Sequence, residues 1–333
     1  MLERRLKKQE EKGLLRSLRV VENAIDFASN DYLGFSRSER LQQAMQQTFQ
    51  TLPKLGSTGS RLLTGNSSFC EELEREIAEI HHAESALLFS SGYMANVGVI
   101  TSLAKREDTI LFDAQIHASM RDGITLSHAK NYAWRHNDLN HLEELLKKRQ
   151  RALVLAESIY STDGSQAPHE LYLLTQRYGA TLILDEAHAL GIFPPSPADI
   201  RIYTFSKTLG VSGAVVLCTH LHRNLFINFA RSFIYTTALP HYTLLAIQCA
   251  YKHLEEEKSE RKKLHALMEY ASKKSPIWTI PTPQARKKAD EILKQGFHVN
   301  ALLPPTVKEA CLRITLHSFN TPQEFDRLCH HLS

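Results

Sequence analysis

Residues 181–188 read TLILDEAH, a short run of apolar and β-branched residues that leads directly into two acids and a histidine. A run this short, with no charged residue inside it, is typical of a strand that is covered on both faces. Residues 200–207, IRIYTFSK, form a similar run, in which Arg201 is the only charge before the polar end at Ser206 and Lys207. Ligands of such sheets bind beyond the carboxyl ends of the strands, so both stretches place polar side chains where a ligand would lie.

The same pattern recurs through the first two thirds of the chain and indicates the fold class. Further short apolar runs, interpreted as strands, are Ala86–Phe89, Thr109–Phe112, Ala152–Ala156 and Ala214–Cys218. Helical stretches separate several of the strands, at Asn96–Ala104, Leu139–Lys148 and Glu170–Tyr178. Nearly continuous apolar strands that alternate with helices predict an α/β fold, with a mostly parallel sheet covered on both faces.

The pattern changes after about residue 235. Residues 242–272 predict one long helix or a broken pair of helices. Short strands and helices then alternate, the strands near Trp278, Val299 and 312–316 and the helices over 285–295 and 322–332. We therefore predict three parts: an N-terminal helix and arm over 1–38, a large domain over 39–234 and a smaller α+β domain over 235–333.

Two local signals lie in the first quarter of the chain. Ser68 and Glu71 have the spacing of a capping box, which predicts that Ser68 caps a helix. An interrupted amphipathic helix at the N-terminus is predicted from Leu2, Leu6, Leu14, Leu15 and Leu18. Because Lys, Arg and Glu dominate that segment, we expect it to lie on the surface.

Composition excludes several classes of protein. The 333 residues are 43% hydrophobic and 23% charged, which is the balance of a globular protein. The net charge of +4 is too small to indicate a nucleic-acid partner, and no stretch approaches the ~18–20 apolar residues that a membrane span needs. Five cysteines without a C-x-x-C pair, and a charged N-terminus without an apolar signal segment, favour a cytoplasmic protein with free thiols.

Asp185 has two possible interpretations. Asp-Glu-Ala-His also occurs as the acidic box of a class of nucleoside triphosphatases, but these enzymes need an upstream G-x-x-x-x-G-K-[ST] loop, which this chain lacks. A solvated loop fits less well, since Asp185 directly follows an apolar strand. We therefore interpret Asp185 as a buried carboxylate that faces a cationic cofactor atom, with His188 three residues further on.

Other strand ends carry polar groups as well. Ser90-Ser91-Gly92-Tyr93 opens a helix, whose free backbone N–H groups suit a phosphate. Lys207, in a partly desolvated pocket, could have a lowered pKa and form a Schiff base. Residues 161–164, Ser-Thr-Asp-Gly, and His117 follow two other strands, so one shared pocket is the simplest explanation. Without an H-E-x-x-H, C-x-x-C or EF-hand pattern, no metal is expected.

Several segments, in order and over nearly the whole chain, match one family. They are SNDYLG (29–34), GSRLLTGN (59–66), LFSSGY (88–93), DEAH (185–188), TFSK (204–207), FIYTTALP (233–240), PPT (304–306) and RITL (313–316). On these motifs the chain resembles the α-oxoamine synthases, which are fold-type-I pyridoxal phosphate enzymes. The resemblance implies the fold-type-I PLP-dependent transferase architecture with a seven-stranded, mostly parallel sheet, and a homodimer.

The resemblance also implies how pyridoxal 5'-phosphate would be bound. Lys207 would hold the cofactor covalently and act as the catalytic base, and Asp185 would pair with the pyridine nitrogen. His188 would hydrogen-bond the ring hydroxyl oxygen, with Ser161 nearby. The phosphate would be bound by Gly92, Tyr93, Thr204 and, from the other subunit, Thr236 or Thr237.

The implied substrates are L-alanine and an acyl thioester, either pimeloyl-CoA or a pimeloyl carrier protein, joined with loss of CO₂. His117 would stack on the cofactor ring and bound the substrate pocket, and Arg313 would bind the amino-acid carboxylate. Arg16 and Thr306 match positions that contact the acyl group. Two alternatives stay open: glycine or serine with another acyl-CoA, or a repurposed protein of this fold without catalysis. The short stretch Phe193–Asp199, where relatives have a longer glycine-rich loop, bears on how the acyl donor is held.

Overall fold

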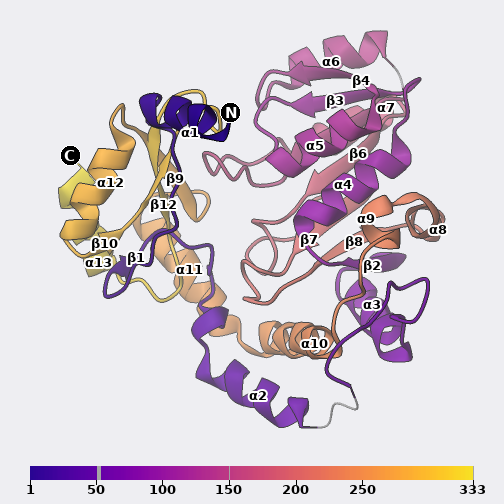
Figure 1. Ribbon diagram of the computed structural model, residues 1–333, viewed down its shortest axis with the longest axis horizontal. Helices are drawn as coiled ribbons and strands as arrows, with labels where there is room; N and C mark the ends of the chain where they lie inside the picture. Colours follow the sequence, from indigo (N-terminus) through magenta and orange to yellow (C-terminus); the bar gives the residue numbers. More distant parts are fainter. Residues whose placement is uncertain (51–53, 150, 333) are drawn as a thin grey trace.

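The computed structural model describes residues 1–50, 54–149 and 151–332, and a seven-stranded sheet forms its larger part (Figure 1). The strand order is β2-β8-β7-β6-β5-β3-β4. These strands are β2 Ser85–Phe89, β3 Thr109–Asp113, β4 Lys130–Trp134, β5 Leu153–Glu157, β6 Thr181–Asp185, β7 Ile200–Thr204 and β8 Ala214–Cys218. Only β8 runs antiparallel to its neighbours, which confirms the predicted, mostly parallel sheet.

Helices cover both faces of this sheet, and alternate strand residues face each side. On one face, Leu155 and Ile183 pack in a core shared with α4, α5, α8 and α9, whereas Val154 and Leu182 pack on the other face with α6 and α7. The strands are therefore continuously apolar because both of their faces are buried. The bounds are α3 Ser68–Ile80, α4 Gly92–Leu103, α5 Ala118–Ser127, α6 Leu139–Lys148, α7 Leu171–Arg177, α8 His220–Phe229 and α9 Arg231–Ile234.

Two features of this region differ from the sequence-based prediction. Strand β4 was not predicted, because it is an edge strand whose residues 130–133 are exposed and only Trp134 is buried, so it has no apolar run. The helix cap lies one residue earlier than predicted. Ser67, not Ser68, is the N-cap of α3, and its side chain accepts a hydrogen bond from the Cys70 amide. The residue at N3 is thus Cys70, and no capping box forms.

A smaller antiparallel sheet, in the order β11-β12-β9, forms the second part of the molecule. Its strands are β9 Ile277–Pro281, β11 Asn300–Leu302 and β12 Cys311–Thr315, and helices α11 Lys258–Tyr270, α12 Ala285–Lys294 and α13 Pro322–Leu332 lie in the same part of the molecule (Figure 1). Helix α10, His241–Glu256, packs instead against α3 of the larger part. The long helical stretch is therefore a broken pair, interrupted at Glu257, whose side chain accepts from the Ser259 amide and caps α11. The predicted domain boundaries at residues 38 and 234 stay predictions.

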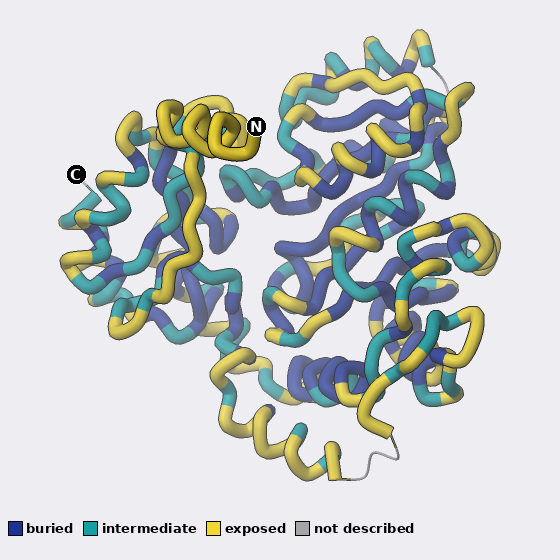
Figure 2. The backbone as a smooth tube through the Cα atoms, viewed as in Figure 1, coloured by how far each residue is buried: buried dark blue, intermediate teal, exposed yellow. Residues whose placement is uncertain are grey.

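The N-terminal segment crosses to this smaller part. Strand β1, Ile25–Asp26, pairs in parallel with β10, Phe297–His298, and is followed by the 3₁₀ helix η1, Phe35–Arg37, and by α2, Glu39–Phe49. Helix α1, Leu2–Glu11, has no buried residue and ends before Leu14, so the predicted interrupted helix is shorter than expected (Figure 2). Across the described ranges, no helix is long and apolar enough to cross a bilayer.

Candidate active site

The carboxyl ends of β5, β6 and β7 bring three polar residues to one edge of the sheet. Glu157, Asp185 and Thr204 are the last residues of these strands, and Glu157 and Asp185 are register partners across β5 and β6. All three are buried. Because the strands are parallel, their ends meet on the same side, which is the location that the sequence predicted for Asp185.

Hydrogen bonds fix the orientation of the Asp185 carboxylate. Oδ1 accepts from the backbone N–H of Ala187 at 2.9 Å, and Oδ2 accepts from Asn96 Nδ2 at 2.7 Å. Asn96 also donates to Ser119 Oγ at 2.9 Å, and it lies on α4, which covers the sheet. The carboxylate is thus held rigidly, with its negative charge at the strand end.

Lys207 lies just beyond β7, beside this carboxylate pair. Its Nζ is 2.8 Å from His188 Nε2. Burial of the amine lowers the pKa of Lys207 to about 8, and the negative charges of Asp185 and Glu157 oppose that shift. Burial, together with the charges of Lys207 and Arg313, lowers the pKa of His188 well below its usual value, so this imidazole is neutral. A lysine with a pKa of about 8 and a neutral histidine suit a site that transfers protons.

The first turn of α4 forms a cradle that fits a phosphate. The helix begins at Gly92, and Ser91 caps it by accepting from the Met94 amide. A Cβ atom added at Gly92 would lie 3.2 Å from Thr204 Cβ, so the absence of a side chain keeps the helix start open beside the Thr204 hydroxyl. Tyr93 can contribute its backbone only, because its hydroxyl donates to Asp122 on α5. Helix N–H groups and a hydroxyl are suitable phosphate ligands.

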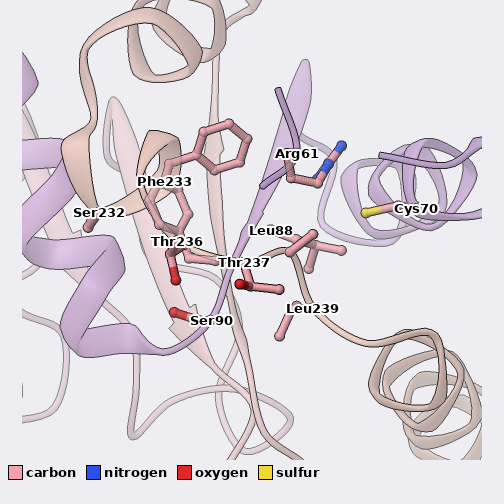
Figure 3. Close-up of a pocket in the computed structure, with 11 residues that line it drawn as sticks. Arg61, Cys70, Leu88, Ser90, Ser232, Phe233, Thr236, Thr237 and Leu239 are labelled. Carbon is pink, nitrogen blue, oxygen red and sulfur yellow. The ribbon is translucent and has the colours of Figure 1, made fainter. Parts of the chain in front are cut away.

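Thr236 and Thr237 lie beside the same end of the large sheet. Together with Ser90, they line a cavity of about 20 Å³, room for about one water molecule (Figure 3). In Figure 3 the hydroxyls of Ser90 and Thr236 lie on the same side of this cavity. The role predicted for Thr236 or Thr237, a phosphate contact across the subunit boundary, stays a prediction.

His117 is the N-cap residue of α5 and exposes its ring at the same edge. Its Nδ1 accepts from the Ser119 backbone amide at 3.2 Å and lies 2.8 Å from Ser119 Oγ. Burial lowers the pKa of His117, the charge of Lys207 acts in the same direction, and the charge of Asp185 opposes it. The structure therefore places His117 near both Asp185 and Lys207, as the sequence predicted.

Arg313 reaches the site from the smaller sheet. It lies on β12, is buried, and donates from Nε to the Ser161 carbonyl oxygen at 2.8 Å. A second donor, Nη2, is 3.0 Å from Asn30 Oδ1. Ser161 in turn donates its backbone N–H to Glu157 Oε2 at 3.0 Å. These contacts hold a guanidinium next to the end of β5.

Arg16 and Thr306 are brought together elsewhere. They line a cavity of about 600 Å³ with Leu15, Arg286 and Leu302, between the N-terminal arm and the smaller sheet. The residues that line this cavity do not include Lys207, Asp185 or His188. The structure thus separates the predicted acyl contacts from the predicted cofactor contacts, and both Arg16 and Thr306 are exposed.

Sequence analysis missed three residues of the site, or quoted them within a segment without assigning a role. Asn96 is buried within an apolar helix, and a polar residue on such a helix was the available signal. Glu157 directly follows an apolar strand, as Asp185 does, and the same reasoning could have identified it. Tyr32 lies inside the SNDYLG motif, but only the structure shows its hydroxyl 2.5 Å from His188 Nδ1.

The residues present fit the cofactor that the resemblance implied. An amine, a facing carboxylate and a phosphate cradle lie at one sheet edge, and buried oxygens of Asn96 and Glu157 have no hydrogen-bond partner within the described part of the chain. Such unpaired buried atoms are uncommon and indicate a missing ligand or ordered water.

Comparisons with known proteins identify the family of the chain. The family model for aminotransferase class I and II matches residues 22–332. The chain is 36% identical to the 8-amino-7-oxononanoate synthase of Emericella nidulans, over 97% of this chain and 92% of the other. The solved 8-amino-7-oxononanoate synthase of Francisella tularensis is 28% identical, covering 93% of this chain and 96% of that one with a TM-score of 0.79. For the serine palmitoyltransferase of Sphingomonas wittichii, the identity is 26%, the coverage 92% and 86%, and the TM-score 0.85.

Proposed function

The chain belongs to the aminotransferase class I and II family and, within it, to the α-oxoamine synthases, and from this premise we propose that it condenses L-alanine with a pimeloyl thioester. It is a pyridoxal 5'-phosphate-dependent C-acyltransferase. The proposed reaction forms a C–C bond between the alanine Cα and the thioester carbonyl carbon, releases the thiol and releases CO₂. The product would be 8-amino-7-oxononanoate, an intermediate of biotin synthesis.

One observation carries the proposal: the Lys207 amine lies near the carboxylates of the strand edge and near the buried guanidinium of Arg313. The amine contacts His188, the charges of Asp185 and Glu157 act on it, and Arg313 lies near enough to depress its proton affinity. An amino acid bound by its carboxylate at Arg313 would thus be close to an amine that can accept a proton. Decarboxylative condensation needs both groups together.

The chain's own groups divide the chemistry between them. When bound, pyridoxal phosphate supplies an electron sink for the bond that breaks at Cα. Asp185 would hold the positive charge at the pyridine nitrogen, and the N-terminus of α4 with Thr204 would bind the phosphate. Lys207 would take the Cα proton, because burial lowers its pKa to about 8, so that about a tenth of the amine is unprotonated at pH 7. His188 would stay neutral and orient its partner groups.

The acyl group would occupy the cavity that Arg16 and Thr306 line. Its walls include Leu14, Leu15 and Leu302, which suit a methylene chain, and Arg16 would face a distal carboxylate. The shape of this cavity depends on the N-terminal arm. We further propose a homodimer, in which Thr236 or Thr237 reaches the partner's phosphate site.

A second candidate is a family member with another amino acid. Its support is the structural likeness to serine palmitoyltransferase, whose TM-score exceeds that of the solved 8-amino-7-oxononanoate synthase. A repurposed protein that binds the cofactor without turnover is a third. The three differ in which amino acid, if any, releases a thiol from the acyl donor.

Thiol release separates these candidates. With pimeloyl-CoA we expect free CoA, detected with a thiol reagent, to appear with L-alanine at ten times or more the rate seen with glycine or L-serine. Mass spectrometry should find the amino ketone and equimolar CO₂. Faster release with serine would favour the second candidate. A protein that binds the cofactor but releases no CoA with any of these amino acids or with a pimeloyl carrier protein would contradict the proposal.

A further inference from the structure

A chain of hydrogen bonds joins Asp185 to His117 through two buried side chains. Asn96 Nδ2 donates to Asp185 Oδ2 at 2.7 Å and to Ser119 Oγ at 2.9 Å. Ser119 Oγ in turn lies 2.8 Å from Nδ1 of His117. Asn96 is 1% exposed and Ser119 is 0% exposed, so water cannot replace either partner. The mechanism above assigns no role to these two residues.

The carboxylate of Asp185 fixes the direction of every bond in this chain. A carboxylate can only accept hydrogen bonds, so Asn96 must turn its NH₂ group, not its carbonyl oxygen, toward Asp185. The same NH₂ group lies against Ser119 Oγ, which must therefore accept from Asn96. Within the described ranges, the hydroxyl proton of Ser119 then has one acceptor, Nδ1 of His117.

A second donor places the same demand on His117. The side chain of His117 caps α5, and its Nδ1 accepts from the backbone N–H of Ser119 at 3.2 Å. Nδ1 thus faces two donors, so the proton of the neutral imidazole is on Nε2. No residue in the described part of the chain accepts from Nε2, which leaves this N–H group for a ligand oxygen.

These contacts do not compete with a bound cofactor. Each carboxylate oxygen has two lone pairs, so Asp185 can pair with the pyridine nitrogen while it accepts from Asn96 and from the Ala187 amide. A hydrogen bond at Nδ1 lies in the plane of the imidazole and leaves the faces of His117 for stacking. The chain therefore holds in the loaded protein as well.

We propose that Asn96 and Ser119 are positioning residues that hold His117 in the tautomer with its proton on Nε2, so that His117 presents an N–H donor to the substrate. The proposal rests on the proposed function, because only then does a substrate lie beside His117. Asn96 thereby has two tasks, since one NH₂ group orients both the carboxylate that serves the cofactor and the imidazole that faces the substrate.

Two variants interrupt the chain at different points. Ser119→Ala removes the hydroxyl alone, and alanine is a good helix former within α5. Asn96→Ala leaves the serine in place, but its Oγ is then free to accept from a protonated Nδ1. The matched control is Ser127→Ala at the other end of α5, whose buried hydroxyl donates to the Ile124 carbonyl oxygen at 2.7 Å.

The readout is hydrogen–deuterium exchange at the ring carbon Cε1 of His117 in the cofactor-loaded full chain. The rate of this slow exchange follows the titration of the imidazole. Mass spectrometry of the tryptic peptide 107–121 reports on His117 alone, because the peptide contains no other histidine. A hydrogen bond donated to Nδ1 stabilises the neutral ring, so Ser119→Ala and Asn96→Ala should each raise the pH midpoint of exchange by about 0.5–1. Ser127→Ala should leave it unchanged.

The charged and titratable groups around His117 are the same in all of these variants. They are Asp185 on β6, His188 after β6, Lys207 after β7, Glu157 at the end of β5, Asp122 on α5 and Tyr93 on α4, which donates to Asp122. A change in the midpoint therefore reports the hydrogen bonds and not a change in the surrounding charge.

The sign of the change decides between the two directions of the chain. A lower midpoint in Ser119→Ala would overturn the proposal, because Nδ1–H would then donate to the hydroxyl in the wild type. An unchanged midpoint in Ser119→Ala, or in Asn96→Ala should the first variant not fold, would overturn it as well. So would an equal rise in Ser127→Ala, which would indicate a general loosening of α5.

The exchange needs neither alanine nor an acyl donor. A raised midpoint in a chain that releases no CoA would therefore support this inference while the proposed function fails.

Discussion

The carboxyl edge of the large sheet and the N-terminal arm both carry predicted site residues, but they hold them by different means. Asp185 and His188 are buried at the sheet edge, and each is fixed by at least two hydrogen bonds. Arg16 is exposed on an arm whose helix α1 has no buried residue (Figure 2). The sheet thus builds its part of the site before any ligand arrives, whereas the arm depends on what binds against it.

The contacts of the arm are correspondingly weak. Arg19 pairs with Asp290 on α12, but both side chains are largely exposed, and such ion pairs contribute at most about 1 kcal/mol. The register of β5 and β6, in contrast, cannot shift without moving every buried residue of both strands. Changes at the edge should therefore remove cofactor chemistry, and changes in the part of the arm that precedes β1, residues 1–24, should alter the handling of the acyl donor only.

The largest effect is expected for Lys207→Ala. The variant loses both the covalent link to the cofactor and the base, so turnover should fall by about 10³-fold or more while the protein stays folded. Borohydride treatment followed by mass spectrometry should find the cofactor on the wild-type chain and not on the variant. Lys287→Ala on α12 is the control and should be labelled normally. Cofactor trapped on the variant chain would refute the assignment.

Asp185→Asn should have the next largest effect. The substitution keeps the size of the side chain but removes the charge that would hold the protonated pyridine nitrogen, so we expect the α-proton exchange of alanine to slow by about 10²-fold. Proton NMR in D₂O measures the exchange directly. Asp199→Asn is a matched control, because Asp199 accepts from the Leu182 amide at the other end of β6. Exchange at the wild-type rate in Asp185→Asn would exclude the electron-sink role.

The stability of the folded chain should also depend on pH, through His136 at the same edge of the sheet. Burial alone would lower the pKa of His136, but hydrogen bonds to Asp113 and Asp163 raise it to about 9. Because this value exceeds that of the unfolded chain, the stabilisation is complete below about pH 6.5 and is lost as the pH rises through 9. After allowance for partial exposure of the ring, we expect the free energy of unfolding to fall by about 1–2 kcal/mol over this pH range.

Thermal midpoints at several pH values measure this effect. The wild-type midpoint should fall between pH 6.5 and 9, and His136→Gln should remove most of the fall. His128→Gln, at the exposed end of α5, is the control and should behave as the wild type. Parallel curves for wild type and His136→Gln would show that His136 does not stabilise the loop that carries Ser161.

Arg16→Ala should have the smallest effect, but it tests most directly whether the arm and the sheet edge act separately. Loss of one charged contact to the acyl group should raise the KM for pimeloyl-CoA by about 10-fold, which corresponds to about 1.4 kcal/mol. The visible absorption and the KM for alanine should not change. Arg19→Ala, in the same arm, should leave both KM values near those of the wild type. A changed cofactor spectrum in Arg16→Ala would contradict the separation of arm and edge.

Sequence analysis predicted those elements whose pattern is local. The six apolar runs became strands, since strands buried on both faces are largely apolar, and the polar residues that followed the five parallel ones gathered at one edge. Strand β4 was not predicted, because an exposed edge strand needs no apolar residues. The cap of α3 was placed one residue too late, since Ser67 and Ser68 are chemically equivalent until the backbone selects one.

The sequence by itself determined the α/β class, the strand ends and the order of Asp185, His188 and Lys207, because each of these follows from neighbouring residues. Only the tertiary structure decided which distant residues complete the site. Asn30 and Arg313 are 283 positions apart, and Tyr32 and His188 are 156 apart, yet each pair is hydrogen-bonded. No periodicity encodes such pairs, since they form only when the N-terminal segment, the large sheet and the smaller sheet pack together.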